Sequence, residues 1–510
     1  MSLVTKVGRK TWKARLAMTV IYSLLCLGAA TTLYPFLVMM TTGFKGPTDQ
    51  NDNRLIPLYW SDQDELLKKY RDDKYSGNMP LMASMEVGKD APEAEIDKYD
   101  NFLMSLPEDQ WLAAFRMPSG QVTSRLSLAW QDFLKKKYRS VDDINTAYTE
   151  INPAFQRIQP PPELLDRWNW NPKQGPKWND WLEFKKSLPA NWRIPIRGQR
   201  LWQEFLRTKY QNQFDQVPAD LKNGADSFEK LTPVKESAIY KEFITKGIPK
   251  AFKNGFIEDQ WAAVSSSQLP TYGSDILYAK RNRNALVAEF SSRNYGYMLD
   301  YILLNGRALW NTVLFCGLAI LTQLIVNPLC AYALSRFPMR ATAKILLFLL
   351  ATMAFPAEVA MIPSFLLLKD LHLLNTFAAL VLPGAASGFM IFLLKGFFDS
   401  LPREVFESGQ LDGASEPLMM WKLAFPLSKP VLGYLALLAF MGAYGSFMHA
   451  FLVAQNRDMW TIMVFIFTLQ GFAPKPVIMA ALTLAAIPTL FVFLAAQRVI
   501  MRGIVLPGER

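Results

Sequence analysis

Few residues of this chain have the types and spacing that chemistry requires. The two histidines, His372 and His449, are too few for a metal cluster. The three cysteines all fall in apolar stretches, which fits neither a disulfide framework nor a zinc site. The sequence also lacks the phosphate-binding pattern G-x-x-x-x-G-K-[ST]. We therefore expect no metal, no cofactor and no enzymatic activity of the chain itself.

One segment does combine acidic, glycine and proline residues at a defined spacing. It reads ESGQLDGASEPLMMWKLAFPLSKP, from Glu407 to Pro430, and lies between two apolar stretches. Ser400 and Pro402, just before it, are typical of helix starts. Glu404 and Glu407 would then lie in the first turns, where the helix dipole favours negative charge. These residues predict a short helix that begins near Pro402.

The same segment predicts where that helix ends. Gly413 can adopt the left-handed backbone conformation that terminates helices. Ser415 can cap a second helix, which we expect to run to Phe425 and to be stopped by Pro426. The loop 402–426 is thus predicted to be a helix, a glycine turn and a second helix.

The elements that must position this loop are apolar. A helix crosses a bilayer with roughly 20 apolar residues, and six stretches qualify: 16–40, 308–335, 343–368, 376–398, 430–453 and 477–497. The shorter stretch 459–476 is interrupted by Gln470, Gly471 and Pro474, and we expect it to form a re-entrant or interfacial hairpin. The predicted fold class is an all-α polytopic membrane protein with six transmembrane helices.

Basic residues indicate the orientation of these helices. They precede the first stretch and follow the sixth, and they lie between the second and third and between the fourth and fifth. The positive-inside rule then places both termini in the cytoplasm. This placement also accounts for the net charge of +11, so we expect membrane lipid and no nucleic acid as a partner.

The region between the first two stretches is too long and too polar to be a simple connection. We divide the chain into 1–42, with the first transmembrane helix, an extracytoplasmic insert at 43–305, and a core at 306–510 with the other five transmembrane helices and the loop 402–426. The insert can bury a core of its own. It contains ten of the fourteen tryptophans, and those at helical spacing are expected in that core.

The insert contains an internal repeat. WQDFLKKKY from Trp130 to Tyr138 matches WQEFLRTKY from Trp202 to Tyr210, and VAEFSSRNY at 287–295 is a weaker third copy. Apolar residues at i, i+3, i+4 and i+8 make one face of a helix in each of the first two copies, so the insert is predicted to be mainly helical. The first copy is similar to a segment of some glycoside hydrolase barrels, but the catalytic carboxylate pair is missing.

One tryptophan-rich segment has a different pattern. In DRWNWNPKQGPKWNDW, from Asp166 to Trp181, Asn, Pro and Gly residues that break regular structure separate the rings. Rings exposed on a loop could stack on sugars, which makes Trp168, Trp170, Trp178 and Trp181 candidate sugar-binding residues. The alternative is that they belong to the core.

The loop 402–426 resembles the cytoplasmic loop of sugar-type importer permeases of ATP-binding-cassette transporters, the subunit type found in the maltose importer. That loop reads Glu-Ala-Ala, two residues, Asp-Gly-Ala, and a proline further on. The matching positions here are Glu407, Ser408 and Gly409, then Asp412, Gly413 and Ala414, and finally Pro426. Ser408 and Gly409 replace two alanines, and a glycine inside a helix costs up to about 1 kcal/mol relative to alanine.

The resemblance, which extends over about 200 residues from Asn311 onward, implies a coupling helix that docks on a separate ATPase. Glu407 would pair with a basic residue of that ATPase, and the tail 502–510 would also contact it. The implied partners are two ATPase subunits, a second permease subunit and an extracytoplasmic solute-binding protein. The implied location is a bacterial inner membrane.

Polar residues inside the apolar stretches are candidates for the translocation path. A charged group at mid-bilayer costs at least about 2.5 kcal/mol, so such residues need a reason to be there. The candidates are Gln323, Asn327, Glu358 and His449. A structural role is the alternative, above all for Glu358 and His449.

These observations favour a permease subunit of a binding-protein-dependent importer of a carbohydrate or oligosaccharide, working by alternating access. Two alternatives remain open. One is a membrane-anchored carbohydrate-binding receptor or scaffold, and the other is an importer of the same family for a non-sugar solute.

Overall fold

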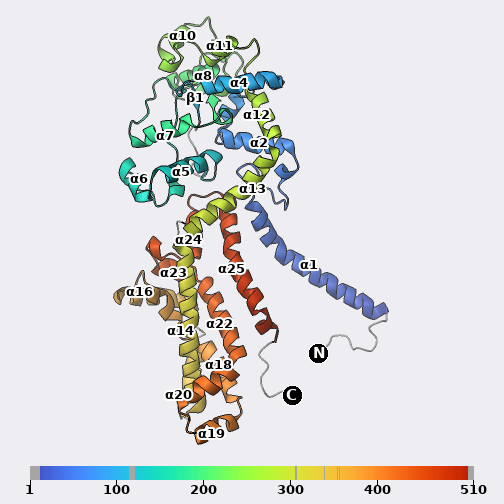
Figure 1. Ribbon diagram of the computed structural model, residues 1–510, viewed down its shortest axis with the longest axis vertical. Coiled ribbons are helices and arrows are strands. Elements are labelled where there is room, and N and C mark those ends of the chain that lie inside the picture. Colours follow the sequence, from blue (N-terminus) through green and yellow to red (C-terminus); the bar gives the residue numbers. More distant parts are fainter. Residues whose placement is uncertain are drawn as a thin grey trace. The chain divides into compact units, whose positions relative to one another are not determined.

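The computed structural model describes residues 12–113, 121–304, 307–337, 339–352, 354 and 356–502 (Figure 1). The described chain is mostly helical, as predicted, and its only strands are β1 (Trp111–Leu112) and β2 (Ile194–Pro195), which pair in an antiparallel ladder. The chain divides into two compact units. The first unit contains the residues up to Met298 together with Phe472–Ala480, and the second contains Leu299–Gly471 and the residues from Ala481 onward.

Short helices build the first unit, apart from the long α1. The α-helices are α1 (Trp12–Thr42), α2 (Gln63–Lys74), α3 (Met79–Ser84), α4 (Glu93–Ser105), α5 (Arg125–Lys137), α6 (Val141–Tyr148), α7 (Pro176–Lys186), α8 (Gly198–Lys209), α9 (Ala219–Lys222), α10 (Ala238–Glu242), α11 (Ile257–Ala262), α12 (Thr271–Arg281) and α13 (Arg283–Leu299). Single 3₁₀ turns lie between several of them, and a π turn follows α10 at Phe243–Gly247.

Tryptophan side chains form the centre of the first unit. Trp111, Trp130, Trp181, Trp202 and Trp261 are each at most 1% exposed. Burial of a large aromatic side chain contributes more apolar area than that of any aliphatic one. The prediction that the tryptophans at helical spacing are core residues is confirmed for this set.

The two nonapeptides WQDFLKKKY and WQEFLRTKY form α5 and α8 and share a ring geometry. Trp130 stacks on Phe133 at 5.6 Å between ring centres, and Trp202 stacks on Phe205 at 6.1 Å. Each tryptophan also meets a later phenylalanine edge-on at 5.4 Å, Phe184 for α5 and Phe243 for α8. The same sequence spacing therefore produces the same local packing twice.

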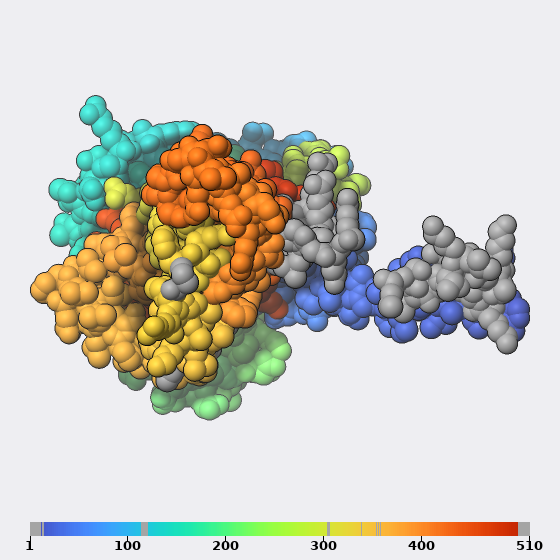
Figure 2. Space-filling view, turned by 90° about the horizontal axis from the view of Figure 1, so that it is seen from below, coloured from blue at the N-terminus to red at the C-terminus, as the bar shows by residue number. Residues whose placement is uncertain are grey.

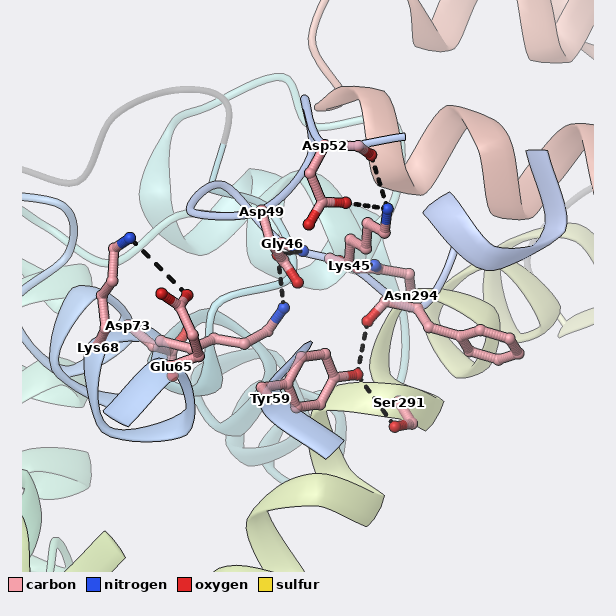
Figure 3. A network of polar contacts seen from close by, with 12 residues as sticks. Lys45, Gly46, Asp49, Asp52, Tyr59, Glu65, Lys68, Asp73, Ser291 and Asn294 are labelled. Carbon is pink, nitrogen blue, oxygen red and sulfur yellow. Dashed lines mark hydrogen bonds and ion pairs between the residues drawn. The ribbon is translucent and has the colours of Figure 1, made fainter. Parts of the chain in front are cut away.

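Polar contacts fix the chain where it leaves α1 (Figure 3). Lys45 is buried and donates to the carboxylate of Asp52 and to the carbonyl oxygens of Asp52 and Arg54, at 2.7 and 2.9 Å. The Nδ2 atom of Asn294 in α13 donates to the carbonyl oxygens of Gly43 and Lys45, at 2.9 and 2.7 Å. Burial lowers the pKa of Lys69, whose partner Asp49, 2.8 Å away, favours its charged form. These bonds hold residues 43–54 against α2 and α13.

The second unit contains the apolar helices from α14 onward. Its α-helices are α14 (Ala308–Arg336), α15 (Thr342–Thr352), α16 (Ala357–Asp370), α17 (Phe377–Val381), α18 (Gly388–Asp399), α19 (Arg403–Leu411), α20 (Glu416–Met419), α21 (Phe425–Leu427), α22 (Lys429–Tyr444), α23 (Met448–Val453), α24 (Ile462–Leu469) and α25 (Lys475–Arg502), the last beginning within the first unit. Helix α14 packs along α18 and α22, and α19 lies at their end (Figure 1).

Several described helices are long and apolar enough to cross a membrane. Arg15–Thr42, Ala308–Arg336 and Lys475–Gln497 qualify singly. Two further spans are possible if each bent pair counts as one: Phe377–Gly384 with Gly388–Asp399, bent by 51°, and Glu416–Leu427 with Lys429–Tyr444, bent by 83°. The stretch 343–368 is divided between α15 and α16. The fold thus fits a polytopic membrane protein, and the count of six remains a prediction.

Candidate functional site

The loop 402–426 begins with the predicted short helix. Helix α19 starts at Arg403, directly after Pro402, and Glu404 occupies its first turn. Its Phe406 side chain is buried, whereas Glu407 and Ser408 are exposed. The predicted helix start is therefore confirmed, and the helix turns one apolar side chain inward and its acidic residues outward.

The end of α19 is also as predicted. Gly413 has a φ of +77°, a backbone conformation that is strained for any residue with a side chain. The N–H of Ala414 donates to the carbonyl of Gly409 at 2.9 Å, and that of Gly413 to the carbonyl of Gln410 at 3.0 Å. This pair of bonds is the Schellman motif that closes helices.

The expected end of the second helix is wrong. Ser415 precedes α20 but makes no side-chain cap, and the helical chain passes through Pro426 to Leu427. A π turn at Met420–Ala424 comes just before the proline, and such turns accommodate local irregularities in a helix. The change of direction comes after Leu427, where the chain bends by 83° into α22.

Side chains from α14 hold the loop in place. The Arg336 guanidinium carbon lies 3.4 Å from the centre of the Phe406 ring, and its Nη2 donates to the carbonyl of Phe398 at 3.3 Å. The Tyr332 hydroxyl donates to Glu416 Oε2 at 2.8 Å. These contacts were not predicted. The segment AYALSRFPMR contains both residues, but no sequence spacing reveals which loop residues they meet.

Glycine also brings the two helices of the loop close together. A Cβ atom added at Gly409 would lie 3.2 Å from Leu423 Cδ1 and 3.3 Å from Met419 Sδ, closer than side chains normally approach. Because Gly409 has no side chain, the side chains of the second helix can approach α19 closely at this position.

The outward face of the loop combines apolar and acidic groups. Leu411 is 89% exposed and Trp421 54% exposed, with the Trp421 ring stacked on Phe425 at 4.6 Å. A hollow of about 200 Å³ between the loop and the end of α14 is lined by Arg336, Glu407 and Glu416, among others. In Figure 2 the orange atoms of this part of the chain lie at the surface facing the viewer.

The remaining residues that matched the importer pattern lie on or near this surface. Asp412 is exposed, Ala414 is half-buried and packs near the core beneath the loop, and Pro426 is exposed. The structure thus brings the seven matched residues together within one loop.

Two of the four polar residues predicted for a path have structural partners. Asn327 is fully buried; its Oδ1 accepts from the Ser387 N–H at 2.8 Å and its Nδ2 donates to the Gln323 carbonyl at 2.9 Å. His449 Nε2 lies 3.0 Å from the Ala379 carbonyl. The Gln323 Oε1 atom is buried and has no hydrogen-bond partner among the described residues. The Glu358 side chain lies outside the described part of the chain.

The candidate sugar-stacking tryptophans divide into two pairs. Trp178 and Trp181 lie in α7 and are 7% and 0% exposed, so the expectation that they sit on a loop is wrong. Helix α7 begins at Pro176, directly after the Pro and Gly residues that suggested irregular structure. Trp168, 44% exposed, and the half-buried Trp170 do lie outside regular helices. Among the described residues, no group of acidic, histidine or cysteine side chains could hold a metal ion.

Comparison with known proteins identifies the family to which the C-terminal part of the chain is similar. Residues 328–505 match the family model described as "Binding-protein-dependent transport system inner membrane component". The chain is 31% identical over 206 residues to the sn-glycerol-3-phosphate transport system permease protein UgpE of Yersinia enterocolitica, covering 39% of this chain and 73% of the relative. It is 30% identical over 204 residues to the sulfoquinovosyl glycerol transport system permease protein SmoH of Agrobacterium fabrum, covering 39% and 72%.

A solved structure is also similar. It is a bacterial ABC transporter involved in the import of the acidic polysaccharide alginate, with 26% identity and a TM-score of 0.36 over 40% of this chain and 78% of that chain. The family membership of the chain rests on the sequence matches. The chain belongs to the family of binding-protein-dependent transport system inner membrane components.

Proposed function

We propose that this chain is a permease subunit of an ATP-driven importer and that α19 with its glycine turn is its coupling helix. The observation that carries the proposal is the outward face of the loop 402–426, where Leu411 is 89% exposed beside the acidic Glu407. Exposed apolar surface next to a charged rim is typical of a protein interaction site. The partners would be two ATPase subunits, a second permease subunit and an extracytoplasmic solute-binding protein.

The loop is suited to transmit motion because it is held rigidly. Arg336 of α14 packs on the Phe406 ring, and Tyr332 of α14 donates a hydrogen bond to Glu416. A displacement of α19 would therefore be transmitted to α14. Alternating access requires such a rigid connection between the ATPase and the helices that line the path. The chain would supply no catalytic group, and ATP would be hydrolysed by the partner.

The arrangement in the membrane is part of the same proposal. The bent pair of α17 and α18 would count as one crossing, α22 as another, and α15 with α16 as a third, which gives six with α1, α14 and α25. Both termini and the loop 402–426 would then be cytoplasmic, and the insert 43–305 extracytoplasmic. The path would pass Gln323, whose buried amide oxygen has no hydrogen-bond partner among the described residues.

The solute we propose is a carbohydrate. UgpE is named for glycerol phosphate and SmoH for sulfoquinovosyl glycerol, and both names denote small polyhydroxylated molecules. A non-sugar solute is the alternative, and a binding protein encoded beside this chain would distinguish them through the ligand that it retains on purification.

The test is binding-protein-stimulated ATPase activity of the reconstituted complex. Glu407→Lys and Leu411→Asp should each abolish the stimulation while the complex still assembles, because both alter the docking face and neither touches the core. The matched control is Asp370→Lys, the same charge reversal at an exposed position of α16, which should leave stimulation unchanged. Unchanged stimulation in both loop variants would refute the coupling role. Failure of any ATPase to co-purify would instead favour the receptor alternative.

A further inference from the structure

The first unit contains a hollow of about 870 Å³ far outside the segment that matches the importer family. Its walls include Trp168, Trp170 and Trp178, and the polar residues Arg167, Asn169 and Asn171 lie between them. Binding sites for small molecules typically span roughly 300–1,000 Å³ and combine aromatic walls with a few polar groups. The hollow has the size and the lining of such a site.

Buried ion pairs fix the loop that forms one wall of this hollow. Glu163 and Lys185 are both fully buried, with Oε1 and Nζ 2.7 Å apart, and Glu163 Oε2 accepts from the Ala113 N–H at 2.8 Å. Three residues later, buried Asp166 pairs with Arg200 at 3.0 Å. Buried pairs of this kind lose much of their Coulombic gain to desolvation, so they are better suited to define one conformation than to add stability.

The aromatic rings that follow these anchors are exposed despite the fixed loop. Trp168 comes two residues after Asp166 and is 44% exposed, whereas the core tryptophans of the same unit are at most 1% exposed. Trp170 meets Trp178 edge-on at 5.8 Å and 75°, so that the two indoles form a corner. Rigidly presented aromatic surface lowers the entropic cost of binding, because few rotamers need to be frozen.

The polar lining indicates what kind of ligand fits. Asn169 and Asn171 are exposed, and each amide can both donate to and accept from a hydroxyl group. The charged groups of the lining are of both signs. Glu108 and Asp109 are opposed by Arg167 and Lys250, and the charge of the third basic residue, Lys185, is balanced by its ion pair with buried Glu163. A lining without excess charge favours a neutral ligand, and flat indoles beside amides match the apolar faces and hydroxyl edges of sugar rings.

We propose that this hollow binds a neutral oligosaccharide. The site would be a second carbohydrate site, separate from the translocation path, and it does not depend on the loop 402–426. Oligosaccharide binding and ATP-driven import are therefore tested by different measurements, so that either proposal can be refuted without the other.

The test is calorimetric titration of the full chain in lipid nanodiscs with maltohexaose, cellohexaose and xylohexaose. At least one should bind with a Kd below about 1 mM, and Trp168→Ala should weaken that binding by about tenfold or more, since a stacked indole is lost. Trp168→Phe should retain most of the affinity. Ile151→Ala changes a residue of the same unit that is 98% exposed and does not line the hollow, and it should have no effect.

Two results would overturn the proposal. One is that none of the three hexasaccharides binds. The other is equal binding by the native chain and by Trp168→Ala, with unchanged thermal unfolding of both. If Trp168→Ala instead weakens only the docking of a solute-binding protein, the hollow is a protein interface and the oligosaccharide site is refuted.

Discussion

The guanidinium of Arg336, in the last turn of α14, lies over the ring of Phe406 in α19, 3.4 Å from its centre. Phe406 is buried and Arg336 half-buried, so this contact is largely shielded from solvent. Desolvated cation–π contacts are worth about 2 kcal/mol, more than exposed ones. The pair thus links the short helix α19 directly to a long apolar helix.

Arg336→Ala should therefore loosen α19 without unfolding the second unit. We expect a decrease of binding-protein-stimulated ATPase activity by about tenfold, the equivalent of roughly 1.4 kcal/mol, with assembly retained. The matched control is Arg340→Ala, which removes an exposed arginine of the same segment and should have little effect. Equal loss in the two variants would indicate a general effect of positive charge near the membrane.

Gly413→Ala tests the glycine turn between the two helices of the loop. Nothing lies within 4 Å of a Cβ atom at this position, so the φ of +77° is the sole obstacle to a side chain. The expected cost is about 1 kcal/mol, seen as faster hydrogen exchange of α19 amides and reduced coupling.

Gly396→Ala is the control for that substitution. Gly396 also has open space around its Cα, but it lies inside α18 with an ordinary helical backbone. There alanine should stabilise the helix by up to about 1 kcal/mol. If Gly413→Ala and Gly396→Ala changed the stability of their helices in the same direction, the explanation from the backbone conformation of Gly413 would be contradicted.

Local signals in the sequence predicted the start and the end of α19 because both depend on adjacent residues. Pro402 sets the backbone before the helix, and Gly413 alone permits the turn after it. Pro426 misled because a π turn at Met420–Ala424 precedes it and the helical chain continues through it to Leu427. That irregularity depends on packing in the loop, which no local pattern encodes.

The tryptophans also divide into those that local sequence patterns predict correctly and those that they do not. Helical spacing correctly placed Trp130 and Trp202 in the core, since period and burial are linked along a single helix. Trp178 and Trp181 were misplaced because Pro and Gly residues also precede helices, as Pro176 does at the first turn of α7. The hollow beside Trp168 depends on ion pairs between distant segments and could not be read from spacing.

Asn327→Leu tests whether this buried amide holds the bent pair of α17 and α18 together. Its Oδ1 accepts from the N–H of Ser387, the N-cap residue of α18, 2.8 Å away. Leucine has a similar size but leaves that partly buried N–H without its partner, which costs up to about 3 kcal/mol. We expect a lower thermal stability and lower uptake. Asn327→Asp keeps the acceptor oxygen and should retain the geometry of the break better than leucine.

The last prediction concerns acid stability of the first unit. Hydrogen bonds from Ser265 and then from Lys98 lower the pKa of Glu95 from its ordinary value of 4.5. A carboxyl whose pKa is lower in the folded state contributes stability above the unfolded pKa, and that contribution is lost as the pH falls through the folded value. Glu95→Gln should therefore lower the unfolding temperature at about pH 7 but make little difference at about pH 3.

Tryptophan fluorescence can report this transition because Trp261 packs edge-on against Tyr99, one turn after Glu95 in α4, at 5.7 Å. Glu236→Gln, at an exposed position between η5 (Phe228–Lys230) and α10, is the control and should not change the pH profile. The unfolding temperature of the native chain relative to Glu95→Gln should fall with acidification. If the difference in unfolding temperature between the native chain and Glu95→Gln stays constant from about pH 7 to about pH 3, the hydrogen bonds do not favour the ionised form of Glu95. The inference that its pKa is lowered would then be wrong.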